Sequence, residues 1–513
     1  MFNQVALLSL PKQDLLRPPG ALPILASACE EKNINYEVYD FNLWLYRNVD
    51  PTMWNKIDNN WSTINPFKDK DALYYQIFVK KVKEYIDILM ASKPDLIAIS
   101  VFTDESAVCA SEVIAYLNQL PDRSLFKIAI GGSGIRCKYI QELTNSKELC
   151  TFLLENNSID HFMFGEGELV FRKLLEQDFN FGGLDNFDAT QIDDLNQFPF
   201  PSYKKIDLTS YAFVGQPELI VTGSRGCVRK CTYCDVANYW PKFKYRSGKN
   251  IADEMYYYHT DLGINSYEFS DSLINGSLKT FRDMNKELIK HKKKDPSFDP
   301  KYKGQFICRP VTEMKERDYI DMADAGCKYI YVGIETFSNK VRYDMRKKFN
   351  NEAIDHHLAM CGKYGISNSF LMFVGYPTEH VEDHTINLEY LKRYQTYALS
   401  GVINLITFGY TAAILKDTPL DLLRDQYNIQ KEYDNFEYEA NWVSLDNPKL
   451  TLKERIKRWV ELVSLADQLG YRQPRIKALI NRYNQILDTI NNKKPFIPIN
   501  SSALTQEYLV KDK

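Results

Sequence analysis

Short apolar runs alternate with amphipathic segments over the first 195 residues of the chain. The runs have the length and composition of buried strands, and helical spacing of apolar residues separates them, for example at 20–33 and 105–120. This alternation predicts a doubly wound parallel α/β sheet, whose ligands bind at the carboxyl ends of the strands. The expected strands lie in QVALLSL (4–10), INYEVYDFN (34–42), PDLIAISVF (94–102), FKIAIGGSG (126–134) and DHFMFGEGE (160–168).

A second alternating series begins after a stretch rich in proline and turn-forming residues at 196–215, which we interpret as a linker. Six strand-like runs with helical patterns between them predict six βα units, and therefore a partial parallel barrel over residues 216–420. The runs stand at 218–223, 266–270, 304–308, 328–334, 369–374 and 402–409.

The last segment, 421–513, has little strand pattern and predicts a helical C-terminal region. Its clearest helix lies in TLKERIKRWVELVSLADQLG, where Thr451 and Glu454 have the spacing of a capping box. Gly470 is expected to end this helix. We expect the tail from residue 491 to be loosely held.

Composition and charge narrow the function classes. The 64 basic and 67 acidic side chains nearly cancel, so no overall field attracts nucleic acid, and the basic run at 290–294 reads as a solvated helix end. No apolar run is long enough to span a membrane, and the N-terminus does not resemble a signal peptide. We therefore expect a cytoplasmic protein, in which clustered cysteines are metal ligands or redox groups rather than disulfides.

Three of the ten cysteines, Cys227, Cys231 and Cys234, fall within eight residues just after the first strand of the second series. A structural zinc site needs four ligands, and no neighbouring cysteine or histidine pair completes one here. A 4Fe–4S cluster held by three thiolates instead leaves one iron open for a substrate or cofactor. The spacing therefore favours a working cluster, with a structural zinc site or a redox-sensing metal module as the alternatives.

The motif Cys-x-x-x-Cys-x-aromatic-Cys at the start of a partial barrel resembles that of the radical S-adenosylmethionine enzymes, with Tyr233 in the aromatic position. The resemblance implies a 4Fe–4S cluster on Cys227, Cys231 and Cys234, whose open iron binds S-adenosylmethionine. It also implies reductive cleavage of that cofactor to methionine and a 5′-deoxyadenosyl radical.

Further motifs resemble the subgroup of this family that has an N-terminal cobalamin-binding-type domain. Gly-Ile-Glu-Thr at 333–336, followed by Met345 and Lys347, is similar to its fourth-strand motif and implies that Glu335 faces S-adenosylmethionine. FLMFVGYPTE at 370–379 resembles the fifth-strand motif beside the adenine, with Gly375 and Glu379.

Three other matches are less complete. Arg309 corresponds to a third-strand arginine that could pair with the cofactor's carboxylate, although a packing role fits it nearly as well. Asp271 occupies the position of a second-strand acidic pair, but Ser272 replaces the second aspartate. KDTPLD at 416–421 resembles the turn that ends the barrel, with Asp417 in place of the usual glycine.

The resemblance leaves cobalamin binding open. A Rossmann-like cobalamin site would use the strand ends that carry Pro11, Ser100, Phe102, Gly131 and Gly132. FGEGE at 164–168 is also typical of the subgroup, but its Asp-x-His-x-x-Gly element is absent. Because the first histidine of the chain is His161, no histidine can reach cobalt from the loop after the first strand.

These features predict a radical S-adenosylmethionine enzyme that performs cobalamin-dependent methylation of an unactivated carbon. The alternative is cobalamin-independent rearrangement, cyclisation or oxidation, and a non-catalytic iron–sulfur or zinc module is a third reading. We expect a small-molecule substrate and an electron donor such as flavodoxin or ferredoxin. The identity of the substrate cannot be read from the sequence.

Overall fold

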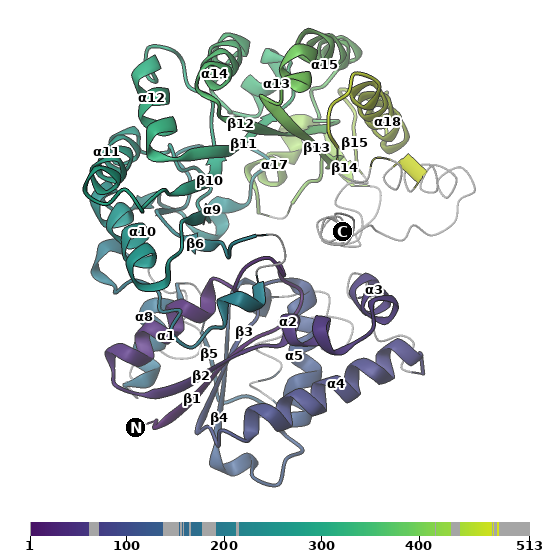
Figure 1. Ribbon diagram of the computed structural model, residues 1–513. Coiled ribbons are helices and arrows are strands. Elements are labelled where there is room, and N and C mark those ends of the chain that lie inside the picture. The colour runs from purple at the N-terminus through teal and green to yellow at the C-terminus, as the bar shows by residue number, and fades with distance from the viewer. Residues whose placement is uncertain are drawn as a thin grey trace. The chain divides into compact units, whose positions relative to one another are not determined.

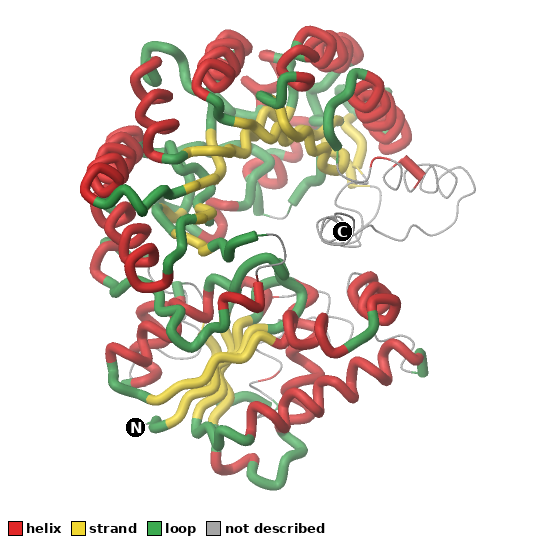
Figure 2. The backbone as a smooth tube through the Cα atoms, viewed as in Figure 1, coloured by secondary structure: helices red, strands yellow, loops and turns green. Residues whose placement is uncertain are grey.

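The structure is a computed structural model that describes residues 2–60, 71–136, 158–163, 166–176, 191–211, 215–415, 417–431 and 442–473, with a few isolated positions beyond these ranges. The chain divides into two compact units, formed by Met1–Pro217 and by Glu218–Tyr508 (Figures 1 and 2). Among the described helices, none combines the length and apolar character needed to cross a membrane.

The N-terminal unit contains the predicted parallel sheet. Its strands are β1 (Gln4–Ser9), β2 (Asn35–Asp40), β3 (Leu96–Ser100), β4 (Lys127–Gly131) and β5 (His161–Met163), in the order β2-β1-β3-β4-β5. In this doubly wound order all strands are parallel, and the order in which successive strands are added reverses between β1 and β3. The loops after these two strands therefore diverge, and they leave a crevice position at the carboxyl edge of the sheet.

Helices cover both faces of this sheet, which explains why its strands are apolar without alternation. In β1, Val5 and Leu7 belong to a cluster with one set of helices, whereas Ala6 and Leu8 belong to a cluster with the other. The first set is α1 (Ala21–Glu31) and α8 (Gly167–Leu175), and the second is α2 (Phe41–Asn48), α3 (Pro51–Asn60), α4 (Leu73–Met90) and α5 (Asp104–Leu117).

The segment that we expected to be a linker is bound to the N-terminal unit. The Ser202 hydroxyl and the Lys204 ammonium donate to the Glu30 carboxylate over 2.6 and 2.8 Å. The Tyr211 hydroxyl donates to Asp40 over 2.6 Å. Proline and turn residues in the sequence indicated irregular backbone, but they carried no information about these distant partners.

The second unit contains the predicted partial barrel, in which each strand pairs in parallel with the next one along the chain. Helices such as α10 (Gly248–Leu262), α11 (Leu278–Lys294) and α14 (Asn351–Tyr364) alternate with these strands (Figure 1). The strands are β6 (Leu219–Val221), β9 (Ser266–Phe269), β10 (Lys301–Phe306), β11 (Cys327–Glu335), β12 (Ser367–Val374) and β13 (Ile403–Thr411).

The C-terminal region is part of the barrel unit. Helix α18 (Leu452–Gln468) begins as predicted, because the Thr451 hydroxyl accepts a hydrogen bond from Glu454 N over 3.2 Å. Its fully buried Trp459 donates to Gly409 O in β13 over 2.8 Å. The region also holds an antiparallel ribbon of β14 (Ile429–Lys431) and β15 (Trp442–Ser444), which a purely helical expectation missed. The tail from residue 491 lies outside the described residues.

Candidate functional site

The three cysteines lie on one loop of the barrel unit. The loop follows β7 (Ser224–Arg225) and ends at the short helix α9 (Val236–Tyr239), beyond the carboxyl end of β6. All three thiols are free and partly buried. In the described part of the chain, no three Cys, His, Asp or Glu side chains converge as ligands of one metal ion would.

The surroundings of the thiols act on the charge of their sulfur atoms in two opposite directions. Burial raises the pKa of each thiol, and the positive charge of Lys347 acts against that rise at all three. The backbone N–H of Arg229 donates to Cys227 Sγ over 3.3 Å, and that of Val236 donates to Cys234. Backbone donors and nearby cations are the groups that support thiolate-bound iron–sulfur clusters. The residues present therefore fit a cluster.

Thr232, between the second and third cysteines, anchors the loop to the rest of the barrel. Its side chain is fully buried and lies 2.7 Å from the Tyr376 hydroxyl. Its backbone N–H donates to Met345 O over 3.2 Å, and its carbonyl accepts from Leu420 N over 2.7 Å. We did not identify this residue from the sequence. A small hydroxyl side chain among larger neighbours was the only available signal.

Beside the loop, Tyr233, Glu335 and Lys347 form one hydrogen-bonded group. The Tyr233 hydroxyl and the Lys347 ammonium both donate to Glu335 Oε1, over 2.9 and 2.8 Å. Lys347 also donates to the Tyr233 oxygen over 3.2 Å. Burial is the largest single influence and disfavours the charged form of Lys347. The charge and hydrogen bond of Glu335 and the thiols of Cys231 and Cys234 together outweigh burial, so the pKa of Lys347 lies above its usual value. The aromatic residue of the cysteine motif is thus joined directly to the fourth-strand glutamate.

The backbone conformation of β11 makes room for the hydrogen-bonded group of Tyr233, Glu335 and Lys347. Glu335 has a φ of +62°, in the left-handed region, and the pairing of β11 with β12 shifts register between Gly333 and Glu335. A Cβ atom on Gly333 would lie 2.5 Å from Glu335 Oε1 and 2.9 Å from Lys347 Nζ. Gly333 therefore leaves the space that the ion pair occupies. Left-handed backbone at a non-glycine residue is uncommon and concentrates at functional sites.

Asp271 and Arg309 are held by hydrogen bonds to neighbouring strand ends. The buried Asp271 carboxylate accepts from Gly223 N over 2.8 Å and from the Ser224 hydroxyl over 2.5 Å. Burial raises its pKa to about 7, although the bond from Ser224 opposes the rise. Arg309 donates to the carbonyls of Asn275 and Gly276, each over 2.9 Å. These contacts tie β6 to β9 and fix the loops that carry the site.

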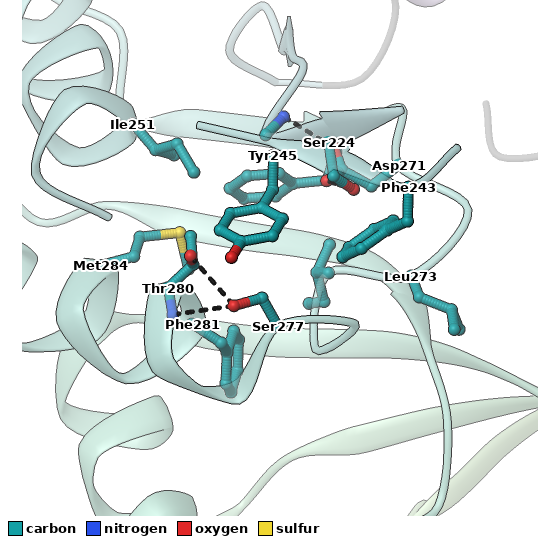
Figure 3. A pocket seen from close by; sticks show the side chains of 13 residues that line it. Ser224, Phe243, Tyr245, Ile251, Asp271, Leu273, Ser277, Thr280, Phe281 and Met284 are labelled. Carbon is teal, nitrogen blue, oxygen red and sulfur yellow. Dashed lines mark hydrogen bonds between the residues drawn. The ribbon is translucent and has the colours of Figure 1, made fainter. Parts of the chain in front are cut away.

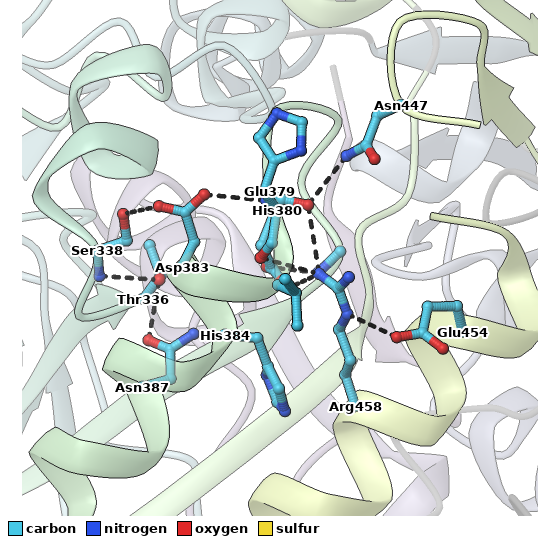
Figure 4. A network of polar contacts seen from close by, with 12 residues as sticks. Thr336, Ser338, Glu379, His380, Asp383, His384, Asn387, Asn447, Glu454 and Arg458 are labelled. Carbon is cyan, nitrogen blue, oxygen red and sulfur yellow. Dashed lines mark hydrogen bonds and ion pairs between the residues drawn. The ribbon is translucent and has the colours of Figure 1, made fainter. Parts of the chain in front are cut away.

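Glu379 is turned into the protein interior (Figure 4). Its carboxylate accepts from Gly375 N over 2.8 Å and from Arg458 Nη1 of α18 over 3.1 Å. Gly375 has a φ of +84°, and a Cβ there would lie 2.3 Å from Arg455 Cδ. Burial raises the pKa of Glu379. The fifth-strand motif thus shapes the turn after β12 and docks α18 against it.

Asp417, which stands in place of the usual glycine in the turn after the barrel, adopts the backbone conformation that the position requires. Asp417 has a φ of +62°, so it adopts the left-handed backbone for which glycine is usual at this position. Its backbone N–H donates to Asp421 over 3.0 Å, which holds the turn. Lys416 lies outside the described residues.

A pocket opens on the helix side of β6 and β9 (Figure 3). Phe243 and Tyr245 form one wall, and Ser277 and Thr280 from the start of α11 form another. Asp271 is the one candidate residue that lines this pocket, and its carboxylate is bound to Gly223 and Ser224 as described above. The cysteines, Tyr233 and Glu335 do not line it. We therefore do not assign this pocket to the site.

The residues considered for cobalamin lie at the carboxyl edge of the N-terminal sheet. Pro11 follows β1, and Ser100 and Gly131 end β3 and β4. Phe102, in the loop after β3, is 60% exposed. The FGEGE element is only partly described, because residues 164 and 165 lie outside the described set.

Gly132 has a packing reason of its own. Its φ is +109°, and a Cβ would lie 2.4 Å from Val101 O. A larger residue there would displace the backbone after β3, whatever the domain binds. Gly132 is therefore needed for the close approach of two loops, and a variant of it cannot isolate ligand binding.

Comparison with known proteins agrees with this geometry. Residues 221–390 match the family model described as the radical SAM superfamily. An uncharacterised methyltransferase of Pyrococcus horikoshii is 23% identical over 322 residues, which cover 60% of this chain and 66% of that protein. The match thus spans slightly less than two thirds of the relative's length.

Two solved structures share the fold over nearly the whole chain. One is the radical S-adenosylmethionine methyltransferase TsrM from Kitasatospora setae with cobalamin and a 4Fe–4S cluster bound; the TM-score is 0.61 at 14% identity, covering 96% of this chain and 100% of that one. The other is the cobalamin-dependent S-adenosylmethionine radical enzyme OxsB with aqua-cobalamin bound; the TM-score is 0.61 at 16% identity, covering 96% and 71%. The sheet orders and the family match together confirm the resemblance inferred from the motifs: residues 221–390 belong to the radical SAM superfamily.

Proposed function

We propose that this protein is a radical S-adenosylmethionine enzyme that methylates an unactivated carbon of a small molecule with the help of cobalamin. The observation that carries the proposal is the group formed by Tyr233, Glu335 and Lys347 beside the cysteine loop. A structural zinc site or a redox sensor would have no need of a strained glutamate and a buried lysine at that place.

The residues of the chain have separable roles in this proposal. Cys227, Cys231 and Cys234 hold a 4Fe–4S cluster, which supplies an electron and an open iron for S-adenosylmethionine. Glu335 accepts hydrogen bonds from the cofactor's polar groups, and Lys347 fixes the direction of that carboxylate. The Tyr233 ring packs edge-on against the Phe373 ring, with 5.2 Å between the ring centroids. This contact excludes water from one side of the group formed by Tyr233, Glu335 and Lys347.

Three further observations support methylation with cobalamin as the outcome. The two solved structures with the same fold bind cobalamin, and the curated relative carries a methyltransferase name. The order of the N-terminal sheet creates a crevice position beside β1 and β3, where Pro11, Ser100 and Phe102 lie. Since no histidine precedes His161, cobalt would receive no imidazole from the loop after β1.

The cluster would need an electron donor and a reducing compartment. Reduction of the cluster requires an electron donor, for which flavodoxin or ferredoxin is suitable. Exposed iron–sulfur clusters need a reducing compartment, and we place the protein in the cytoplasm. Asp271, Arg309, Gly375 and Glu379 then support the cofactor site through the strand ends that they fix.

Iron content tests the ligand assignment. After anaerobic reconstitution, the wild-type protein should hold about four irons and four sulfides per chain. Replacing Cys227, Cys231 or Cys234 with alanine should remove them, because each thiolate binds its own iron. Cys109→Ala, which removes a buried thiol of the N-terminal unit, is the control and should keep the cluster. One zinc per wild-type chain, with no iron, would contradict the assignment.

Cofactor affinity tests Glu335. Glu335→Gln keeps the shape of the side chain but removes its charge, so S-adenosylmethionine should bind roughly tenfold to a hundredfold more weakly, the loss of one charge-assisted hydrogen bond. Equilibrium dialysis with the reconstituted protein measures this, and iron analysis checks that the cluster remains. The matched control is Glu316→Gln, the same change at a surface carboxylate that pairs with Lys363. Unchanged affinity in the Glu335 variant would remove it from the cofactor site.

Corrin binding separates methylation from the alternative reactions. Protein mixed with hydroxocobalamin should retain corrin absorbance through gel filtration. Phe102→Ala should weaken corrin binding roughly tenfold, because the substitution removes a large exposed ring that would contact the corrin at the crevice. Leu125→Ala, which truncates another exposed apolar residue of the same unit (72% exposed), should bind normally. If wild-type protein retains no corrin, the enzyme is a radical mutase, cyclase or oxidase instead.

A further inference from the structure

Arg229 lies within the cysteine motif, between Cys227 and Cys231. Its backbone N–H donates to Cys227 Sγ over 3.3 Å, which fixes the residue against the thiol. Its side chain is half-buried, and its Nε is shielded from solvent without a hydrogen-bond partner in the described part of the chain. A partly desolvated guanidinium whose Nε has no hydrogen-bond partner among the described residues is stabilised by a nearby negative charge.

The carboxylate beside Arg229 does not supply this negative charge, because it is paired with another arginine. Its electrostatic neighbours are Arg309, Glu313 and the thiols of Cys231 and Cys227. Glu313 already pairs with Arg309 over 2.8 Å. The other cation near the thiols, Lys347, is likewise paired with Glu335 over 2.8 Å. Glu313, a charged neighbour of Arg229, and Lys347, a charged neighbour of the thiols, are therefore each paired with another residue.

We infer that Arg229 is the counter-charge of the iron–sulfur cluster and sets how easily the cluster is reduced. The inference rests on the proposed function, in which the three cysteines hold a 4Fe–4S cluster. Reduction adds one electron and so increases the negative charge on the cluster and its thiolates. A fixed cation that is shielded from water stabilises the reduced form more than the oxidised form. In this inference Arg229 is a positioning residue that acts on electron entry through the cluster.

The sign of the effect follows directly. Removing the charge of Arg229 withdraws stabilisation mainly from the reduced cluster, so the midpoint potential should fall. A lysine at the same position keeps a positive charge and should restore most of the potential. Lys230, the next residue, is exposed to solvent, and its charge is screened by water and salt. It provides a control with the same loss of charge in the same loop.

The experiment is an anaerobic redox titration of the reconstituted full-length protein, followed by electron paramagnetic resonance. At a fixed potential near the midpoint, Arg229→Gln should lower the ratio of reduced to oxidised cluster about tenfold, a fall of about 59 mV for a one-electron couple. Arg229→Lys should recover most of this shift, and Lys230→Gln should differ little from the wild type. Iron analysis accompanies each variant, so that loss of the cluster is not read as a change in potential.

The outcomes separate this inference from the proposed function. If the wild-type protein holds no iron–sulfur cluster, both fail. If Arg229→Gln keeps the cluster and the wild-type midpoint, the inference fails and the proposed function stands. If Arg229→Gln keeps that midpoint but binds S-adenosylmethionine more weakly, Arg229 serves an anionic group of the cofactor instead, which also overturns the inference. Equal shifts in Arg229→Gln and Lys230→Gln would show a general charge effect rather than a role for the shielded guanidinium.

Discussion

The ion pair between Glu335 and Lys347 is the interaction on which the arrangement of the site depends. It joins the end of β11 to the segment that follows it, and through the Tyr233 hydroxyl it reaches the cysteine loop. A buried pair of this kind is costly to break, because removal of one partner leaves the other charge without compensation. The geometry of the loop and the direction of the Glu335 carboxylate are therefore set together.

Several residues that the motifs predict to be cofactor ligands also hold the backbone around the site. Asp271 holds the first residues after β6, Glu379 holds the turn after β12, and Gly375 makes room for Arg455. Each fixes the carboxyl end of one strand, where barrels place their chemistry. These motif residues thus shape the rim of the barrel, and their predicted contacts with S-adenosylmethionine stay a prediction.

The sequence predicted the strands of both sheets most clearly where buried parallel strands leave apolar runs, as in β3. Strand β10 alternates buried and partly exposed residues and begins at Lys301, before the expected run at 304–308. The sequence predicted the cysteine loop because the spacing of three thiols is specific. It did not show which way Glu379 turns, since its partner Arg458 is 79 residues away in the chain. Nor did it identify Thr232 or Arg229, whose importance lies in buried contacts and charge balance. Residue type and spacing locate a site, whereas the division of labour within it depends on contacts between distant segments.

The central claim of the proposed function is that the cysteine loop holds a 4Fe–4S cluster whose open iron binds S-adenosylmethionine. Electron paramagnetic resonance of the reduced wild-type protein, recorded with and without S-adenosylmethionine, tests it most directly. The account predicts a 4Fe–4S signal whose g values change when the cofactor is added, because the cofactor binds the open iron. A cluster signal that is identical in the two spectra, or the absence of a 4Fe–4S signal, would contradict it.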